Sequence, residues 1–559
     1  MSSLKILRVA LALSALPFVA TCEQPSTPSE IVDRIVAQEQ SEIKLLRQYS
    51  PLVETYIQYF RLDKRLGTVQ DGDKYFLGRA KLANVVELEP LEYQSGLKRK
   101  LSEDWREFVT IGFVPGGFVQ MIYVDASSFD RQHYKFEYIR REFLGEVRCL
   151  VFDVGPLKKN DKGRFVGRIW VEDQDYHLVR FNGSYGESFL LSKYFNFDSW
   201  RTNIGTNLWL PSFVYIEQGN VHDPQTTKLA FKPFRAQTRL WGYHLGHAGE
   251  EQELTKMLVE APTPIRDQTE TANDYSPLEA QRAWERQAET NVTDHLERQG
   301  LLAPHGEVDK VLETVVNNLE LTNSLDIQPE VRCRVLLTST LESFNIGHTI
   351  VLSRGLVDVL PDEASLAAIL AHELGHIVLA HGMDTQFAFF NTMQFKEKDT
   401  FRHFAFTHTP TEERAAQRKA NELLTNSPYN EKPETAQLFL EALKKESKDI
   451  PNLVSAHLGD RVPTNWIIAS AGSSAQHSDA KPATNAVAAL PLGGRIKVDP
   501  WSDQLQMVKA RPGPAMSEGE KMSFQITPFA FYLTRQSDNS AAKPAAGVAA
   551  KLDANANPR

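Results

Sequence analysis

"AILAHELGHIVLAH" (residues 368–381) places two histidines and a glutamate inside an otherwise apolar helical pattern. His372 and His376 are four residues apart, so a helix puts both imidazoles on one face, about one turn from each other. In this HExxH pattern the two imidazoles can hold zinc, while the adjoining Glu373 accepts a proton from the attacking water. The sequence therefore predicts one Zn²⁺ per chain, bound by His372 and His376, with Glu373 as the catalytic base.

A catalytic zinc needs a third protein ligand and an open position for water. The best candidate lies in "THTPTEERAAQRKANELL" (residues 407–424). Thr409 and Pro410 begin a helix there, and Glu412, three residues after the threonine, completes a capping box. If Glu412 reaches back to Thr409, Glu413 is the free carboxylate. Glu413 is therefore the predicted third ligand, with Glu412 as the competing choice.

The helix that begins at Pro410 carries small residues on the face of Glu413. Ala416 and Ala420 follow the glutamate at helical spacing, so this face can approach the histidine helix closely at Gly375. We expect the two helices to meet there, which would bring the glutamate to the two histidines.

Three more histidines lie near these helices. His381 follows His376 by five residues and does not share its helix face, so a structural role is expected. His403 and His408 precede the second helix and remain open as spare metal ligands, although histidines in loops usually bind no metal. None of the three belongs to the predicted ligand set.

The segment from residue 308 to residue 461 resembles peptidase family M48, the HtpX- and BepA-like zinc metalloproteases, or gluzincins. "SFNIGHTIVLSRGLVDVLPDEASLAAILAHELGHIVLAH" (residues 343–381) mirrors the family's strand, its RGLLD turn and its LAHELAH…H run. Asn345 matches the asparagine before the family's edge strand. The family's ExxAD helix corresponds to Glu413–Gln417, where glutamine replaces the aspartate that orients the neighbouring histidine. The resemblance implies a mainly helical zinc peptidase domain in which this orientation is altered.

The same resemblance implies one more site residue. The family's late HP…R pattern is echoed by "SAHLGDR" (residues 455–461). His457 is therefore a candidate to contact the metal site or the oxyanion, with Arg461 as its support. An ordinary surface position for His457 remains equally open.

The N-terminal half has a different texture. Residues 28–46 show a helical pattern, and from about Tyr75 short aromatic and β-branched runs are broken by Gly, Asp and Asn, which predicts an antiparallel sheet. Over residues 134–218 these runs, with "GRIWVED" and the later "WLP", resemble the LolA-like carrier domains. That resemblance implies a half-open sheet around a lipid or acyl chain.

The first residues form an export signal. Lys5 and Arg8 precede an apolar run over residues 9–20 that is too short for a membrane span. We expect export to the periplasm or envelope, with cleavage near Cys22. Cys22 also stands where a lipoprotein carries its acylated cysteine, so a lipid anchor is an alternative to plain cleavage. No later apolar run reaches about 18 residues, so no transmembrane helix is expected.

The composition limits the functional classes. The chain has 559 residues and a hydrophobic share of 42%, enough for several domains with buried cores. The formal net charge is −9, so a nucleic-acid partner is not expected. Cys149 and Cys333 lie far apart in strand-like runs and are expected to be buried free thiols.

The predicted fold class is multidomain α+β. An N-terminal antiparallel β domain is followed by a central, mainly helical HExxH domain with a small edge sheet, and then by a C-terminal β segment. The expected boundaries are a signal peptide at 1–22, the helix plus LolA-like sheet at 26–250, a helical connector at 251–300, the zinc metallopeptidase domain at 301–465, the β segment at 466–535 and a disordered tail at 536–559.

Two functions follow from these patterns. The first is a zinc metalloendopeptidase of the cell envelope, of the EC 3.4.24 type, which cleaves unfolded or extended protein substrates with zinc-activated water. The strand over residues 349–353 is expected at a sheet edge, where it could pair with the substrate. The alternative is a lipid or lipoprotein carrier, or an envelope assembly factor, that keeps the zinc site as a scaffold. This alternative rests on the LolA-like pattern and on Gln417, which stands where the family has an aspartate.

Overall fold

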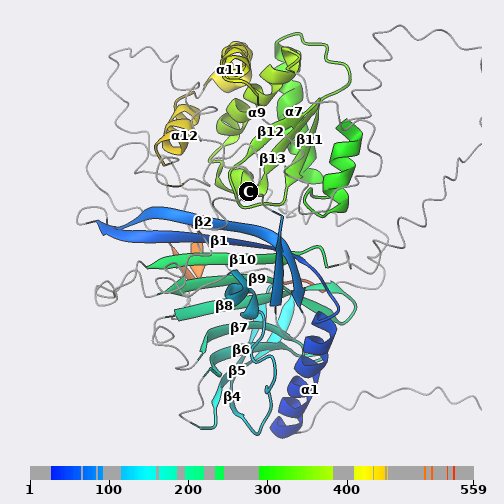
Figure 1. Ribbon diagram of the computed structural model, residues 1–559, viewed down its shortest axis with the longest axis vertical. Coiled ribbons are helices and arrows are strands. Elements are labelled where there is room, and N and C mark those ends of the chain that lie inside the picture. Colours follow the sequence, from blue (N-terminus) through cyan, green and yellow to red (C-terminus); the bar gives the residue numbers. More distant parts are fainter. Residues whose placement is uncertain are drawn as a thin grey trace, which may run out of the picture.

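The computed structural model describes residues 27–63, 67–82, 86–91, 115–158, 163–185, 195–218, 233–243, 289–381, 408–431, 433–446, 450, 496–498, 505–507, 526 and 533–535. The predicted signal peptide with Cys22, most of the connector, His403, His457, Arg461 and the C-terminal tail lie outside the described residues. A large antiparallel sheet and a smaller α+β unit, drawn above it in Figure 1, make up most of the described chain. The predicted α+β class with an N-terminal antiparallel sheet is confirmed.

The large sheet has ten strands in the order β3-β2-β1-β10-β9-β8-β7-β6-β5-β4. Every neighbouring pair is antiparallel. The strands are β1 (Leu52–Asp63), β2 (Gly67–Leu82), β3 (Val86–Pro90), β4 (Tyr134–Leu144), β5 (Val147–Pro156), β6 (Phe165–Glu172), β7 (Leu178–Tyr185), β8 (Phe195–Gly205), β9 (Leu208–Gln218) and β10 (Phe234–Trp241).

The sheet begins earlier in the chain than its sequence pattern predicts. Strand pairing starts at Leu52, whereas a strand texture was expected only from about Tyr75. Residues 52–60 are buried without interruption, because both faces of β1 are covered. A strand buried on both faces loses the alternation of polar and apolar residues by which a strand is recognised.

One face of the sheet carries α1 (Pro28–Leu46), with the short α4 (Pro115–Gln120) nearby (Figure 1). A reciprocal capping box starts α1, and the helix extends to Leu46, within the stretch where a helical pattern was expected. Its Glu39 and Glu42 form buried ion pairs with Arg201 of β8. Its apolar side chains enter one core with that face of the sheet, namely Val32, Ile35, Ile43 and Leu46.

The opposite face of the sheet packs against the smaller unit. Side chains alternate between the two faces of a strand, so Tyr56 and Trp209 point away from the α1 side. They share a core with residues of the smaller unit, among them Leu302, Phe344 and Val351. The Trp241 indole N–H also donates to the Gly300 carbonyl over 2.7 Å. The two units therefore share one hydrophobic core.

The smaller unit contains a three-stranded sheet and six helical segments among its named elements. They are α7 (Glu307–Thr322), β11 (Arg332–Leu336), β12 (Ser343–Ile346), β13 (Thr349–Ser353), α8 (Arg354–Val359), α9 (Glu363–Val378), α11 (Pro410–Thr425), the 3₁₀ helix η6 (Pro428–Glu431) and α12 (Pro433–Glu446). The order of the sheet is β11-β13-β12, with β11 parallel and β12 antiparallel to β13.

This order corrects one expectation. The strand over residues 349–353 was expected at an edge, but β13 lies in the centre and pairs on both sides. The reason is a tight hairpin, in which Gly347 adopts a φ of +58° and folds β12 back onto β13. The edge on this side of the sheet is therefore β12.

A few described residues of the C-terminal region form a strand pair or contact the large sheet. β14 (Ile496–Val498) and β15 (Leu505–Met507) form an antiparallel pair. The Leu533 carbonyl accepts from the Glu146 amide over 2.9 Å, and Arg535 forms an ion pair with Glu172. These contacts fasten the last described residues to the N-terminal sheet.

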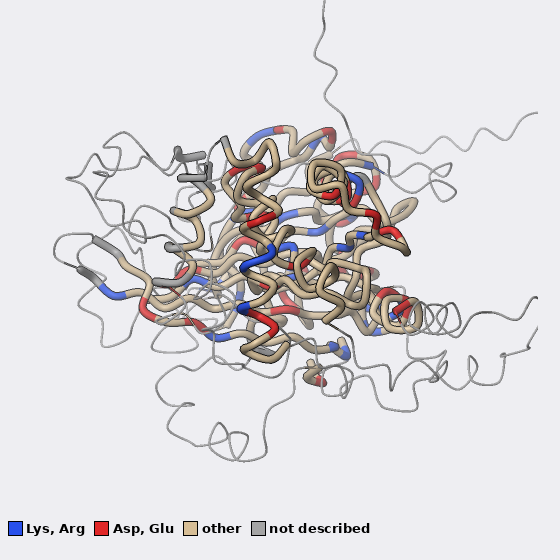
Figure 2. The backbone as a smooth tube through the Cα atoms, turned by 90° about the horizontal axis from the view of Figure 1, so that it is seen from above, with Lys and Arg blue, Asp and Glu red and all other residues tan. Residues whose placement is uncertain are grey.

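Three further expectations concern thiols, membrane helices and charge. Cys149 and Cys333 are both free and buried, as predicted, and burial raises the pKa of the Cys149 thiol to about 12. Within the part of the chain that the structure describes, no helix combines the length and apolarity needed to cross a membrane. Figure 2 shows acidic and basic residues interspersed along the described chain.

Candidate metal centre

The helix α9 carries the HExxH pattern through the interior of the smaller unit. Asp362 caps its first turn by accepting from the Ser365 amide over 2.9 Å. Residues 369–377 of the helix are all buried. The ionisable groups of the pattern therefore lie in the core, where an unpaired polar group costs about 2 kcal/mol or more.

The helix α11 brings the third residue of the site. Thr409 and Glu412 form the predicted capping box, in which the Thr409 amide donates to the Glu412 carboxylate over 2.8 Å. Glu413 is left to point inward and is buried. The close approach depends on Gly375, because a Cβ atom there would lie 2.7 Å from the Ala416 carbonyl oxygen.

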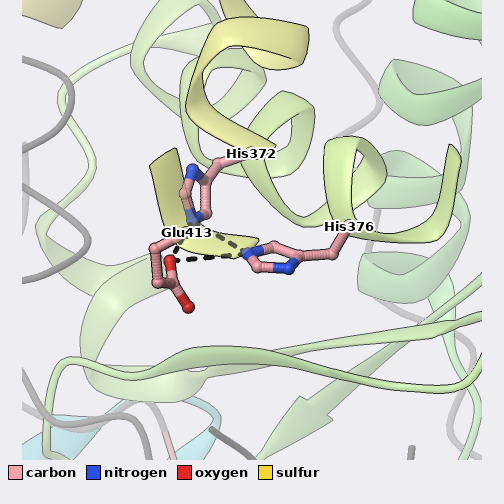
Figure 3. A group of neighbouring side chains, drawn as sticks. All are labelled: His372, His376 and Glu413. Carbon is pink, nitrogen blue, oxygen red and sulfur yellow. Dashed lines mark hydrogen bonds and ion pairs between the residues drawn. The ribbon is translucent and has the colours of Figure 1, made fainter. Parts of the chain in front are cut away.

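Three side chains converge between α9 and α11 (Figure 3). Oε2 of Glu413 lies 3.1 Å from Nε2 of His372 and 3.5 Å from Nε2 of His376. The two histidine Nε2 atoms are 3.4 Å apart. The structure thus places Glu413, and not Glu412, at the face that the two histidines share.

The converging atoms fit a divalent cation. Two imidazoles and one carboxylate form a donor set that catalytic zinc sites use, with a further position left for water. Among the described residues, no hydrogen-bond partner reaches the buried Oε1 of Glu413. A buried carboxylate oxygen without a donor is unfavourable in the protein alone, and a bound cation would satisfy it.

The electrostatics of the trio also favour a positive charge at its centre. Burial lowers the pKa of His372, but Glu413 and Glu373 outweigh this effect and leave the pKa above its ordinary value. Burial likewise raises the pKa of Glu413, but hydrogen bonds from His372 and His376 outweigh it and leave the pKa lowered. A carboxylate that remains ionised beside two imidazoles is suited to hold a cation.

Glu373 lies next to the trio and outside it. Its Oε1 accepts a hydrogen bond from the Ser343 hydroxyl over 2.7 Å. Burial raises its pKa above the ordinary carboxyl value, which makes it a stronger base than an exposed glutamate. Ser343 was not predicted from the sequence, because its contact crosses 30 residues and no pattern marks it.

Gln417 occupies the place of the family's aspartate and still contacts the histidine. Its Oε1 lies 3.1 Å from Nδ1 of His372, and its amide nitrogen donates to the Asn421 side chain over 3.1 Å. With the amide oxygen as acceptor, Nδ1 carries the proton and Nε2 is left for a metal. The replacement keeps an oxygen acceptor at this place and makes it neutral.

His381 and His408 surround the ring of His376. Nδ1 of His381 lies 3.0 Å from Nδ1 of His376. His408 stacks on His376 with ring centroids 3.9 Å apart, and its Nε2 lies 2.8 Å from the Asn345 side-chain oxygen. Burial lowers the pKa of His408 to about 4. Neither ring belongs to the converging trio.

A second acidic cluster has different chemistry. Glu172, Asp175 and His177 also lie close together, in the β6–β7 turn. The Glu172 oxygens accept from the backbone amides of Gln174, Asp175 and His177 and from Arg535. This carboxylate organises a turn and is already satisfied.

His372, His376 and Glu413 all lie in a segment that matches one protein-family model. Residues 306–419 match the model of peptidase family M48. The match runs from the start of α7 into α11, so it contains His372, Glu373, His376 and Glu413. This region is therefore related to a peptidase family, and a metallopeptidase is the class of activity that it indicates.

The other comparisons add less. The search of curated proteins found no match. Among solved structures, a DUF1329 family protein from Desulfovibrio piger matches with 10% sequence identity, over 38% of this chain and 91% of that chain, at a TM-score of 0.20. That score is too low to indicate a shared fold. The LolA-like resemblance of the N-terminal region thus stays a prediction.

Proposed function

We propose that the protein is a zinc-dependent endopeptidase. The observation that supports this function is the convergence of His372, His376 and Glu413 beside the buried base Glu373. The convergence lies inside the segment that matches a peptidase family. One zinc ion per chain is proposed.

Each side chain has a proposed role. His372, His376 and Glu413 would hold zinc through Nε2, Nε2 and a carboxylate oxygen. Bound zinc would supply a Lewis acid that polarises the scissile carbonyl and acidifies the attacking water. Glu373 accepts the proton of that water and passes it to the leaving amine. The Ser343 hydroxyl orients the Glu373 carboxylate for both transfers.

The edge strand β12 supports an extended protein segment as the substrate. Among the strands that the structure describes, β12 pairs with β13 alone, and Ser343 of β12 contacts Glu373. A peptide that added to this edge would run past the base with its carbonyls aligned by backbone hydrogen bonds. Unfolded or loop segments can adopt that conformation, whereas folded domains cannot.

The deciding experiment combines metal analysis with proteolysis. Purified protein should contain about one zinc per chain and should cleave casein, since only one set of three ligands is proposed. Glu373→Gln should keep the zinc and lose cleavage, while a double His372→Ala, His376→Ala variant should lose both. Zinc retained in the double variant would rule out this site.

The compartment is proposed from the N-terminal sequence. Export to the periplasm or envelope, with cleavage near Cys22, would place the enzyme among envelope proteins, where misassembled chains are suitable substrates. Intact mass and N-terminal sequencing of the protein from its native host would test this. An intact Met1 would contradict export, and an acylated Cys22 would establish a lipid anchor.

Carriage of a lipid or acyl chain is the second candidate, and one observation favours it. A cavity of about 430 Å³ lies at the ends of β8, β9 and β10. Apolar side chains that include Ile204 and Phe213 line it, together with Arg239 and Arg354. Mass spectrometry of an organic extract of the purified protein would show a retained lipid. Ile204 lines the cavity and is 43% exposed, so Ile204→Trp can fill it without entering a packed core. This variant should abolish the lipid signal without affecting zinc content, and persistence of the signal would exclude this cavity.

A further inference from the structure

A buried carboxylate of the large sheet contacts the loop that leads into β12, the strand that carries Ser343. Glu54 of β1 is only 1% exposed. Its Oε1 accepts from the Ser339 amide over 2.6 Å and from the Tyr75 hydroxyl over 2.9 Å. Its Oε2 accepts from the Ser339 hydroxyl over 2.8 Å, and Arg239 lies 3.3 Å away as an ion-pair partner. One side chain thus holds both the backbone and the side chain of Ser339.

Further contacts fix the same loop, residues 337–342, which joins β11 to β12. Gln237 of β10 donates to the Ser339 hydroxyl over 2.8 Å. Gly355 lies directly against the loop, because a Cβ atom there would be 2.2 Å from the Ser339 carbonyl oxygen. The Ser353 hydroxyl donates to the Thr340 carbonyl and accepts from the Glu342 amide. These contacts leave the loop little freedom to shift.

The loop ends at the residue that holds the base. Ser343 follows Glu342 directly and begins β12, and its hydroxyl donates to Glu373. Only four positions separate Ser339 from Ser343. A displacement of Ser339 would therefore move the start of β12, and with it the hydrogen bond to Glu373 and the alignment of the substrate edge.

We propose that Glu54 of the N-terminal sheet is a positioning residue for peptide hydrolysis in the smaller unit. It acts through Ser339 and Ser343, and it touches neither substrate nor metal. The inference rests on the proposed peptidase function. In this proposal the N-terminal sheet helps to position the catalytic glutamate, in addition to any role in binding a ligand.

The test compares two variants with a matched control. Glu54→Gln keeps the side-chain shape but replaces an acceptor oxygen by an N–H₂ group. Ser339→Ala removes the hydroxyl that donates to Glu54 and accepts from Gln237, while the backbone hydrogen bond to Glu54 and the Glu54–Arg239 pair stay. Asp198→Asn is the control, because Asp198 is a buried carboxylate of the same sheet whose ion-pair partner, Arg180, lies on the neighbouring strand.

Two readouts separate positioning from stability. In Glu54→Gln and Ser339→Ala, kcat on casein should fall about 10- to 100-fold, as expected when a catalytic group is slightly misplaced, while zinc content stays at the wild-type level. Amide hydrogen exchange in residues 337–346 should become faster in metal-free protein. Asp198→Asn should change neither readout, whatever it does to the unfolding temperature.

Each outcome decides the inference. Wild-type kcat and wild-type exchange in Glu54→Gln would overturn it, and so would an equal loss of kcat in Asp198→Asn. If the wild-type protein cleaves no protein substrate, the proposed function fails. The exchange measurement then still shows whether Glu54 holds this loop.

Discussion

Oε2 of Glu413 lies 3.1 Å from Nε2 of His372, although 41 residues separate them in the chain. The contact exists because α11 packs on α9 where Gly375 faces Ala416. The capping box turns Glu412 toward the helix start and leaves Glu413 facing inward. A local rule of helix initiation thus decides which of two adjacent glutamates reaches the histidines.

The first prediction separates these two glutamates. Glu413→Gln should weaken zinc retention, because a neutral amide is a poor ligand for Zn²⁺. The loss should exceed the roughly 10- to 100-fold that removal of an outer partner of a ligand costs. Glu412→Gln should bind zinc like the wild type, since glutamine also completes a capping box. Competition with a chromogenic chelator measures both, and equal losses would refute the assignment.

The second prediction concerns the contact between the helices. Gly375→Ala should force α9 and α11 apart and destabilise the protein by about 1–3 kcal/mol, as overpacked cores do. Zinc affinity should fall with it, because Glu413 moves away from the histidines. Gly155→Ala is the control, since a Cβ atom there meets nothing within 4 Å. Urea unfolding and zinc titration of both variants would show a difference, and its absence would contradict the proposed role of the glycine.

The third prediction addresses the residue that replaces the family's aspartate. Gln417→Leu removes the acceptor of the His372 Nδ1 proton and should lower zinc affinity about 10- to 100-fold. Gln417→Glu keeps the reach and supplies a charged acceptor, so zinc should bind at least as tightly as in the wild type. Isothermal titration with zinc measures both. If the leucine variant binds zinc normally, Gln417 has no part in orienting the histidine.

The fourth prediction is a pH dependence of stability. Burial raises the pKa of Glu172, but hydrogen bonds from Arg535 and from two backbone amides outweigh it and leave the pKa below its ordinary value of 4.5. A lowered pKa in the folded protein stabilises it above pH 4.5, and this contribution is lost as the pH falls through the folded value.

Glu172→Gln should therefore reduce the free energy of unfolding near neutral pH. The variant should also lose less of its remaining stability than the wild type between neutral pH and pH values below 4.5. Urea unfolding across this range provides the measurement. Parallel stability curves for the two proteins would show that this carboxylate does not couple folding to pH.

Local sequence rules predicted much of the site. The spacing of His372 and His376 and the capping box at Thr409 each depend on residues within four positions of one another. The inward direction of Glu413 followed from the capping box, and the structure agrees.

The remaining features depend on contacts between distant residues. β12 lies at an edge because it pairs only with β13 among the described strands, while β11 pairs with the opposite side of β13. The hydrogen bonds of Ser343 to Glu373 and of Ser339 to Glu54 cross 30 and 285 residues. No spacing in the sequence marks such partners. The first contact depends on how β12 packs on α9 within the smaller unit, and the second on how the two units pack together.

The pairing of β1 with β10 has a consequence for how the chain acquires its structure. Leu52 lies opposite Trp241, so the strand at the start of the sheet cannot complete its hydrogen bonds until nearly two hundred further residues exist. On a ribosome, β1 could pair only with β2, in a small meander of β1, β2 and β3 that lacks the rest of the sheet. The contacts between β1 and β10 form only after this long loop has closed, and closure costs conformational entropy. Pairing of these two strands is therefore expected to be slow during refolding. Until β10 arrives, the free edge of β1 is exposed to pairing with other chains.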